Sequence, residues 1–275
     1  MVPTIAIMTD FGIKDGNVGV MKGVIWGICP QAHIADISHM IRAQDIREAA
    51  LILSRSVPYF PPGTIHLVVV DPGVGTARRP MAARIGSQFY VGPDNGLITL
   101  WLQRARAEGQ NLRFVNLNNP RYWLSDISHV FHGRDIFAPC AAHLARGVPL
   151  EDLGSLIEEP AEVALPRPTR VRDGWDGEVI HIDHFGNVAS NLRVEDLSGL
   201  LRKKHAAHIS LGGAEIHGIV DTFGDRPPGE LVALLGSTGN LIVSVVNGNA
   251  ASALGVHVGD KFVVRVDESE AGQTS

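Results

Sequence analysis

The sequence predicts two domains: an α/β domain with a mainly parallel sheet flanked by helices, and a smaller all-β, barrel-like domain. Strand-like and helix-like segments alternate in the first part of the chain, which is typical of βαβ units. Further on the helical pattern largely disappears, and short β-branched segments are separated by glycine-rich turns. A tract with three prolines, residues 158–172, stands between the two parts. We expect domains at 1–160 and 173–268, a linker at 161–172 and a flexible tail at 269–275.

Each element of the first domain is predicted from apolar periodicity and from the residues that end it. Asp15 is the expected N-cap of the first helix, and Pro30 and Pro58 each follow a helix that they cannot continue. The expected elements are, in order, a strand at 4–9, a helix at 15–28, a strand at 33–37, a helix at 44–57, a strand at 65–70, a hairpin at 81–85 and 88–91, a helix at 96–107, a strand at 112–117 and a helix at 134–144.

The second domain is predicted to contain strands only. Short runs rich in branched and apolar residues are bounded there by glycine, asparagine and aspartate, and none has helical periodicity. The expected strands lie at 177–182, 208–211, 215–220, 231–235, 241–246 and 261–266.

Composition excludes several classes of protein. The chain has 275 residues, 45% of them hydrophobic and 19% charged, which is ordinary for a soluble globular protein. Its net charge of −5 provides no basic face for nucleic acid. The two cysteines, Cys29 and Cys140, have no CxxC spacing and are expected to be buried thiols. With neither a signal peptide nor an apolar run of about 18 residues, we expect a cytoplasmic protein that does not contact a membrane.

The first candidate site lies where apolar strands end in carboxylates. The stretch 65–78 reads IHLVVVDPGVGTAR, so that a strand buried on both faces ends near Asp71 and a glycine-rich turn leads to Arg78. Asp10 follows the first strand in the same way. Ligands of open α/β sheets bind at the carboxyl ends of the strands, so these residues are candidates for a site. The structural alternative is an ion pair that only pins a turn.

Other polar motifs have weaker functional interpretations. Asp94 and Asn95 in GPDNG are expected to cap the following helix. His132 in FHGRD precedes a helix, whose N-terminus would lower the pKa of the imidazole and keep it neutral near pH 7. In HIDHFGN, His181, Asp183 and His184 invite a metal interpretation, although neighbours on a strand face opposite sides. The turns around Ser237 and residues 247–250 could offer polar groups to a heterocycle. The motifs GxGxxG, GxxxxGK[ST], HExxH and GxSxG are absent.

Taken together and in order, these motifs carry a resemblance that covers nearly the whole chain. MTDFG, DPGVGTARR, GPDNG, FHGRDIFAP, IDHFGN, GSTGN and NGNAAS resemble the S-adenosylmethionine (SAM) hydroxide adenosyltransferase family, the hydrolytic relatives of fluorinases and chlorinases. The resemblance implies an α/β domain followed by a β-barrel. It also implies a homotrimer with active sites between one subunit's N-terminal domain and a neighbour's C-terminal domain. The implied reaction converts SAM and water into adenosine and L-methionine, with SAM as substrate and no cofactor or metal.

The resemblance also implies a role for individual residues. Asp71, Arg78 and His132 match the set that handles the attacking water, and Asp10 matches the carboxylate that holds both ribose hydroxyls. Asp183 matches the partner of the methionine ammonium group. The remaining matches are Ser237 near the methionine carboxylate, Phe185, Asn187 and Ala250 around adenine and ribose, and Phe223 as a stacking ring.

Differences from the halogenating branch favour water as the nucleophile. Asp71 stands where fluorinases have a tyrosine, Gly133 stands where they have a halide-binding serine, and their long insertion near Gly86 is absent. A carboxylate near the nucleophile would repel a halide. Three alternatives stay open: a halogenase of the same fold, a non-catalytic SAM-binding module, and a metal-dependent hydrolase. The possible metal ligands of the last are Asp10, Asp71, His132 and His184.

Overall fold

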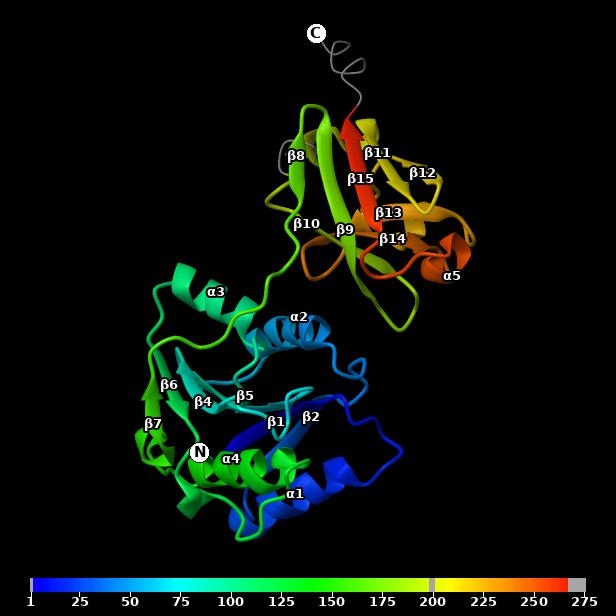
Figure 1. Ribbon diagram of the computed structural model, residues 1–275. Coiled ribbons are helices and arrows are strands. Elements are labelled where there is room, and N and C mark those ends of the chain that lie inside the picture. Colours follow the sequence, from blue (N-terminus) through cyan, green and yellow to red (C-terminus); the bar gives the residue numbers. More distant parts are fainter. Residues whose placement is uncertain (1, 198–200, 267–275) are drawn as a thin grey trace. The chain divides into compact units, whose positions relative to one another are not determined.

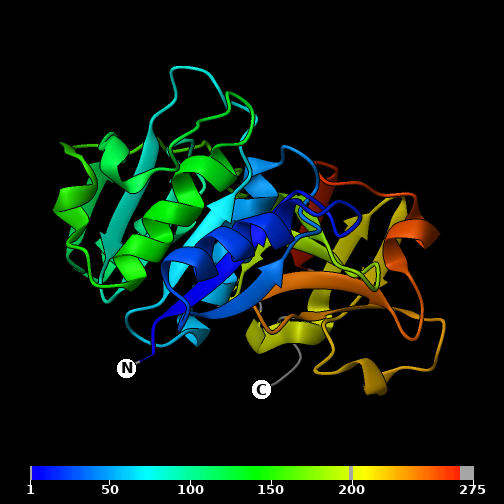
Figure 2. The same cartoon turned by 90° about the horizontal axis from the view of Figure 1, so that it is seen from below.

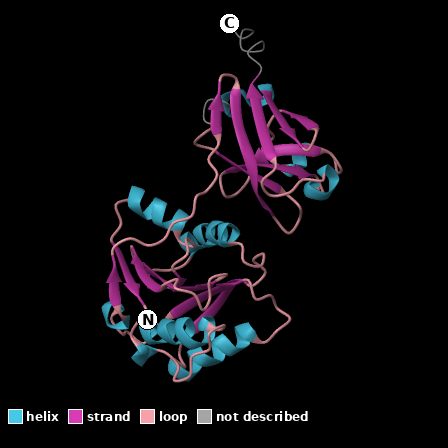
Figure 3. Cartoon of the chain, in the orientation of Figure 1, coloured by secondary structure: helices cyan, strands magenta, loops and turns pink. Residues whose placement is uncertain are grey.

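The structure, a computed structural model, describes residues 2–197 and 201–266 and divides the chain into two compact units, Met1–Ala164 and Leu165–Ser275. The first unit contains most of the helices and the second consists mainly of strands (Figure 3). The expected α/β domain followed by an all-β domain is confirmed at this level. The tail predicted at 269–275 lies outside the described residues. No helix in the described part of the chain is long and apolar enough to cross a membrane.

The first unit is built on a seven-stranded sheet in the order β2-β1-β3-β5-β4-β6-β7. Neighbours from β2 to β5 pair in parallel, whereas β4 pairs antiparallel with both β5 and β6, and β6 with β7. The prediction of a mainly parallel sheet is therefore corrected to a mixed one. The strands are β1 (Thr4–Thr9), β2 (His33–Ser38), β3 (Ile65–Val69), β4 (Pro80–Ile85), β5 (Gln88–Pro93), β6 (Leu112–Asn116) and β7 (Ser155–Ile157). The two-residue connection between β4 and β5 allows only an antiparallel pair.

Helices cover both faces of this sheet (Figure 1). Helices α1 (Asn17–Ile28) and α4 (Ala138–Ala145) lie side by side on one face, as the second view also shows (Figure 2). Helices α2 (Ile46–Ser56) and α3 (Thr99–Ala107) cover the other. Leu67 and Val69 belong to the first of the two resulting cores, and Val68 and Val70 to the second. The central strand β3 is therefore apolar except at His66, because both of its faces are buried.

Two of the expected helix caps are not found in the structure. Asp45 caps α2 by accepting a hydrogen bond from the Glu48 backbone N–H at 2.9 Å. Asp15 does not cap α1, since Gly16 occupies that position and makes no side-chain bond. Helix α3 begins at Thr99 because Asp94 and Asn95 are engaged elsewhere. The shorter helices are η1 (Val57–Tyr59), η2 (Pro120–Tyr122), η4 (Leu150–Leu153) and a π-helical turn, η3 (Gly133–Phe137).

The second unit is an antiparallel sheet in the order β12-β11-β15-β9-β10-β14-β13, with β8 paired to β9. Val220, just beyond β12, bridges to Leu234 of β13, so the two ends of the sheet approach each other and the unit is barrel-like. Its strands are β8 (Thr169–Val171), β9 (Gly174–Ile182), β10 (Val188–Arg193), β11 (Ala207–Leu211), β12 (Ala214–His217), β13 (Leu231–Leu235), β14 (Asn240–Val245) and β15 (Lys261–Val266), and its helices are η5 (Leu201–Ala206), η6 (Phe223–Asp225) and α5 (Ala250–Leu254).

Five of these elements were not predicted from the sequence, among them the short helices η5 and η6. Strand β8 lies inside the segment 161–172 that was expected to be a linker, and β10 was not assigned at all. Helix α5 is a short α-helix in a domain predicted to contain strands only. Asn249 caps it by accepting from the Ser252 backbone N–H at 2.8 Å. The polar NGNA turn is thus in part the start of a helix.

Candidate active site

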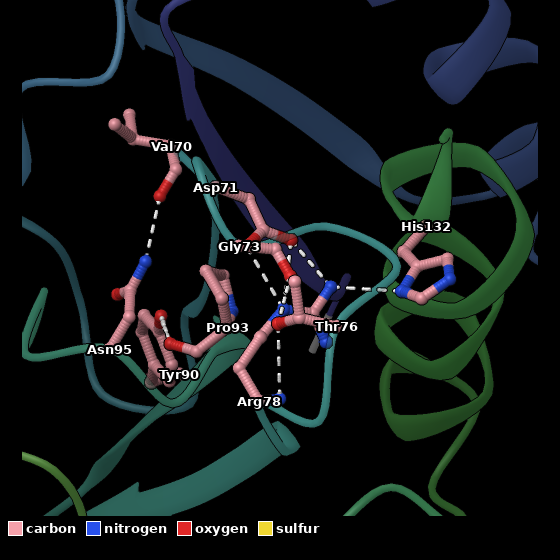
Figure 4. A network of polar contacts seen from close by, with 9 residues as sticks. All are labelled: Val70, Asp71, Gly73, Thr76, Arg78, Tyr90, Pro93, Asn95 and His132. Atoms are coloured by element: carbon pink, nitrogen blue, oxygen red, sulfur yellow. Dashed lines mark hydrogen bonds and ion pairs between the residues drawn. The ribbon is translucent and has the colours of Figure 1, made fainter. Parts of the chain in front are cut away.

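Asp71 stands just beyond the buried strand β3, and its side chain is only 5% exposed. The backbone turns sharply here, with the Val74 N–H donating to the Asp71 carbonyl at 3.2 Å and Gly75 in the left-handed region at φ 77°. The amide of Asn95 donates to the Val70 carbonyl at 2.9 Å and so fixes the end of the strand (Figure 4). The carboxylate is therefore held at the carboxyl edge of the parallel part of the sheet.

Arg78 makes a forked ion pair with that carboxylate. Its Nε lies 2.9 Å from Asp71 Oδ1 and 3.0 Å from Oδ2, and its Nη2 also donates to Oδ2. The guanidinium carbon lies 5.2 Å from the centre of the Phe137 ring, so the cation is fixed by a charge and by an aromatic face. A planar fork matches a carboxylate in a way that an ammonium group cannot.

His132 joins the same set through Arg78. The Arg78 Nη2 lies 2.9 Å from His132 Nδ1 (Figure 4), and a guanidinium can only donate, so Nδ1 accepts and the ring proton is on Nε2. Burial and the nearby Arg78 charge lower the pKa of His132, while Asp71 and Asp135 oppose that shift. The direction of this shift agrees with the prediction, and burial is its largest cause. We call Asp71, Arg78 and His132 the Asp71 network.

The network is packed against a second loop that precedes His132. A Cβ on Gly75 would lie 2.5 Å from the His129 carbonyl oxygen, so the turn and this loop touch where no side chain fits. Asp135 is fully buried and accepts from the Ser128 N–H at 2.8 Å and from Arg134 Nε at 2.5 Å. These bonds hold the 128–131 segment across the start of the π-helical turn. Such turns are frequent at functional sites.

Asp10 lies at the same edge of the sheet as Asp71. It follows Thr9, the residue that pairs with Val69 of β3, and its Oδ2 accepts from the Gln44 backbone N–H at 2.8 Å. The next residue, Phe11, packs edge-on against Phe131 with 5.8 Å between ring centres. Phe131 precedes His132, so the Asp10 loop packs against the segment that carries one member of the Asp71 network. The four predicted residues of the first unit therefore lie on elements at the same edge of the sheet.

In the second unit, Asp183 organises the turn between β9 and β10. Its Oδ1 accepts from the backbone N–H groups of Phe185 and Asn187, both at 2.9 Å, and its Oδ2 accepts from Asn187 Nδ2 at 2.8 Å. The turn holds the Phe185 ring in solvent, 72% exposed. An exposed ring beside a carboxylate suits a ligand that has both a flat face and a positive charge.

Ala250 belongs to the same cluster in the second unit, because the Ala251 N–H donates to the Gly186 carbonyl at 3.0 Å. A Cβ on Gly186 would lie 2.1 Å from Asn249 atoms, which shows how closely α5 packs on the turn. Ser237 is in a different turn, whose Gly239 carbonyl accepts from Val194 at the far end of β10. Phe223 begins η6 and is 42% exposed. Neither has a described contact that joins it to the Asp183 turn.

Sequence reasoning missed several residues that shape the site. Phe137, under the Arg78 cation, looked like one more apolar residue of a helix. Gln44 acts through its backbone, held at φ 65°, which no sequence pattern indicates. Asp94 was expected to cap a helix but pairs with Arg79, its Oδ2 accepting from Arg79 Nε at 2.8 Å. The motif DPGVGTARR could have suggested that its two arginines have different partners.

The metal interpretation of these residues receives no geometric support. Within residues 2–197 and 201–266, no three histidine, cysteine, aspartate or glutamate side chains gather so as to hold a metal ion. The alternative with Asp10, Asp71, His132 and His184 as ligands thus has no assembled donor set within either unit.

The fold and these residues define a class of two-domain proteins, with a carboxylate–arginine–histidine network on an α/β unit and a polar turn on a barrel-like unit. Sequence models of the SAM hydroxide adenosyltransferase N-terminal and C-terminal domains match residues 5–154 and 177–263. The chain belongs to the SAM hydroxide adenosyltransferase family.

Individual relatives agree with this assignment. The chain is 44% identical to an (R)-S-adenosyl-L-methionine hydrolase of Salinispora tropica, with 95% of this chain and 97% of the relative covered. A protein of the same name from Thermus thermophilus is 41% identical over 92% and 95% of the two chains. A fluorinase of an Actinoplanes species is 31% identical, over 71% and 73%. A crystal structure of an uncharacterized conserved protein from Thermotoga maritima superposes with a TM-score of 0.87 at 35% identity, over 95% and 99%.

Proposed function

We propose that this protein hydrolyses SAM to adenosine and L-methionine by attack of water or hydroxide on the 5′-carbon. The observation that carries the proposal is the Asp71 network, in which the Arg78 guanidinium contacts both the Asp71 carboxylate, at 2.9 and 3.0 Å, and the neutral His132 imidazole, at 2.9 Å. Relatives that match nearly the whole chain bear the name of this activity. The network supplies what the attack of water requires: acceptors for its protons and a fixed position.

The bond-breaking step removes the positive charge from sulfur, the attacking water gives its proton to a base, and a site drier than water favours the loss of charge on sulfur. As the bond from the 5′-carbon to sulfur breaks, the sulfonium becomes the neutral thioether of methionine. An environment less polar than water favours that loss of charge, provided that the substrate is held in line with the nucleophile. Alignment can supply up to about 7 to 11 kcal/mol, whereas one general base gives about 10² to 10⁴-fold. We infer that positioning contributes more than proton transfer.

The geometry favours Asp71 as the group that first accepts the water proton. His132 Nδ1 is already occupied by an Arg78 N–H, and Nε2 carries the ring proton, so the imidazole has no lone pair ready for water. Asp71 Oδ2 accepts two hydrogen bonds from Arg78, but Oδ1 accepts only one and so retains a lone pair for the water. In this proposal His132 orients Arg78, Arg78 orients and balances Asp71, and Asp71 holds the water.

The remaining residues are proposed to hold the substrate. Asp10 would bind the ribose hydroxyls and Asp183 the methionine ammonium group. Ser237 would bind the methionine carboxylate, and Phe185, Asn187, Ala250 and Phe223 would surround adenine and ribose. Because these residues belong to two units, we propose a homotrimer in which one subunit's first unit meets a neighbour's second unit. SAM is the substrate, and no cofactor is part of the proposal.

The test is incubation of the purified protein with SAM in ¹⁸O-labelled water, followed by mass spectrometry of the nucleoside. Hydrolysis at the 5′-carbon places the label on the 5′-oxygen of adenosine. Unlabelled adenosine, or none, would contradict the proposal. The variant Asp71→Asn is the negative control, because a contaminating enzyme would continue to release adenosine in its presence.

A halogenase is the second candidate, because fluorinases are among the relatives. One observation weighs against it: a Cβ on Gly133 would lie 3.3 Å from Met21 Sδ and from Phe131, so a halide-binding serine has little room. Addition of chloride or fluoride to the same assay decides the matter, since a halogenase would form a 5′-haloadenosine in place of adenosine.

A further inference from the structure

The loop that carries Asp10 is fastened to the neighbouring strand by one buried imidazole, that of His39. His39 Nδ1 lies 3.0 Å from Thr9 Oγ1, and the same hydroxyl accepts from the Phe11 backbone N–H at 3.2 Å. The His39 carbonyl accepts from the Gly12 N–H at 2.8 Å. His39 therefore holds the chain on both sides of Asp10.

A β-bulge brings these groups together. Along the parallel pair of β1 and β2, Ile7 is opposite Asp36 but Met8 is opposite Ser38, so Ile37 is the extra residue. The shift of one residue places His39, and not Ser38, next to Thr9. Bulges re-aim side chains in this way, often beside active sites. The imidazole contact to the Asp10 loop depends on this irregularity.

Asp36 and Lys22 orient the imidazole from its other side. Asp36 Oδ1 lies 3.0 Å from His39 Nε2, at ion-pair distance although outside good hydrogen-bond geometry, and Asp36 Oδ2 accepts from Lys22 Nζ at 2.7 Å. A carboxylate beside Nε2 favours the tautomer with the proton there, which leaves Nδ1 to accept from the Thr9 hydroxyl. Thr9 is fully buried, so this aspartate–histidine–threonine series cannot present a nucleophile to a substrate. Its effect is to fix the loop.

The segment that follows His39 also contacts the Asp10 side chain. Gln44, in the left-handed region at φ 65°, donates its N–H to Asp10 Oδ2 at 2.8 Å. One carboxylate oxygen is thereby directed by the backbone of the 39–45 segment, while Thr9 and Gly12 fix the backbone on each side of Asp10. Because this carboxylate is already fixed, it loses little conformational entropy when it accepts hydrogen bonds from two hydroxyl groups.

We propose that His39 is a positioning residue that fixes the Asp10 carboxylate for recognition of a vicinal diol, the 2′- and 3′-hydroxyls of the ribose. This inference rests on the proposed function, because it takes the ligand to be an adenosine derivative. His39 touches no substrate in the proposal. It acts through Thr9 and the backbone of residues 10–12.

The experiment measures the coupling between His39 and the diol. Isothermal calorimetry gives Kd values of adenosine and of 2′,3′-dideoxyadenosine for the wild type and for His39→Ala. The wild type should prefer adenosine by at least about tenfold, because two hydrogen bonds to a charged acceptor are lost with the diol. In His39→Ala that preference should fall about fivefold or more, since the carboxylate is no longer fixed.

Three further variants separate positioning from general damage. His39→Asn keeps a polar atom near Nδ1 and should restore most of the preference, whereas Thr9→Val removes only the hydroxyl and should reduce it as His39→Ala does. His33→Ala, at an exposed position of the same strand, should leave it unchanged. Equal weakening of both ligands by His39→Ala and Thr9→Val would overturn the inference. An absent preference in the wild type would overturn it too. If His39→Ala fails to fold, the preference of Thr9→Val for adenosine over 2′,3′-dideoxyadenosine decides whether the inference holds.

This measurement is independent of turnover. Labelled adenosine from SAM in ¹⁸O-water tests the proposed function. Loss of diol preference in the variants tests the role of His39, and either result can fail while the other holds.

Discussion

At the scale of single residues, Arg78 joins the candidate site together, because it reaches Asp71, His132 and Phe137 at once. Its neighbour Arg79 pairs with Asp94 and takes no part in that network. The chain therefore contains two adjacent arginines with different roles.

Replacement of these two arginines by lysine tests that difference. Arg78→Lys keeps the charge but loses the fork and the contact to His132, so kcat should fall about 10²-fold or more. Arg79→Lys is the matched control and should stay within about threefold of the wild type. Steady-state adenosine release measures both. Equal losses in the two variants would show that Arg78 has no special role.

A second prediction at this scale concerns His66, a fully buried residue that the reaction does not use. Its ring lies between Phe60 and Trp101, and burial lowers its pKa to about 4 although Nε2 bonds Gln88 Oε1 at 2.6 Å. In the unfolded chain the pKa returns to about 6.5, so the unfolded state binds the proton first and acid favours unfolding.

His66 should therefore make the protein less stable as the pH falls from 7 to 4, by about 3 kcal/mol. Urea unfolding at a series of pH values measures the slope. His66→Leu should be less stable at pH 7, since Gln88 loses a partner, but its stability should fall less steeply below pH 6.5. An identical slope in the variant would contradict the assignment.

The sequence indicated candidate site residues where a carboxylate or an arginine comes after a strand that is buried on both faces. Asp10, Asp71 and Arg78 could be found in this way because the end of an apolar run is visible in one dimension. The backbone of Gln44 and the ring of Phe137 could not, since one depends on a left-handed conformation and the other on the packing of a helix against a loop. The bulge that places His39 also has no sequence signal.

At the scale of elements, the turn from Asp71 to Arg78 depends on Gly75. It combines a φ of 77° with a backbone contact, since a Cβ would lie 2.5 Å from the His129 carbonyl oxygen. Gly63 has a similar φ of 85° but open space around it. A comparison of substitutions at the two glycines therefore distinguishes the effect of backbone strain from the effect of steric contact.

Alanine at each position makes that separation measurable. Gly63→Ala should destabilise the protein by about 1 kcal/mol through backbone strain alone. Gly75→Ala should destabilise it by about 1 to 3 kcal/mol more, because the second loop must move, and it should lower kcat as Asp71 shifts. Urea unfolding and adenosine release give both quantities. Equal effects of the two substitutions would show that the loop contact does not matter.

Most elements of the first unit were predicted, because strands buried on both faces give continuous apolar runs. The sheet is nevertheless mixed, since β4 and β7 run against their neighbours, and strand direction depends on connections and not on composition. Helix α5 was missed because it has only five residues and begins in a turn-like NGNA sequence. Short elements have too little periodicity to be recognised.

At the scale of the whole molecule, the residues of the proposed active site are divided between the two units. Asp71 belongs to the first and Asp183 to the second. If each site combines the first unit of one subunit with the second unit of a neighbour, two inactive variants should complement each other.

Asp71→Asn and Asp183→Asn should each be inactive alone. Co-expressed in equal amounts as mixed trimers, they should regain about one quarter of the wild-type activity, because that share of sites combines two intact halves. A site built within one chain would regain none. Mixed trimers of Asp71→Asn with Asp71→Ala, which share the damaged half, are the control and should stay inactive.

The division into two domains could be predicted because the change from alternating to all-β patterning extends over many residues. Part of the candidate site could be proposed because Asp10 and Asp71 follow strand ends. The grouping of Asp183, Phe185 and Asn187 through one carboxylate could not, since it results from hydrogen bonds within a single turn. The sequence does not show which groups in a turn form hydrogen bonds with one another.

The reactivity of the two buried cysteines can be used to measure how often the first unit opens. Cys29 and Cys140 are both fully buried there, and burial raises the pKa of the Cys140 thiol well above its usual range. A maleimide or disulfide reagent can reach neither sulfur until the surrounding helices separate. The rate of thiol modification should therefore report how often this unit opens. If bound adenosine stabilises the closed form, it should lower that rate.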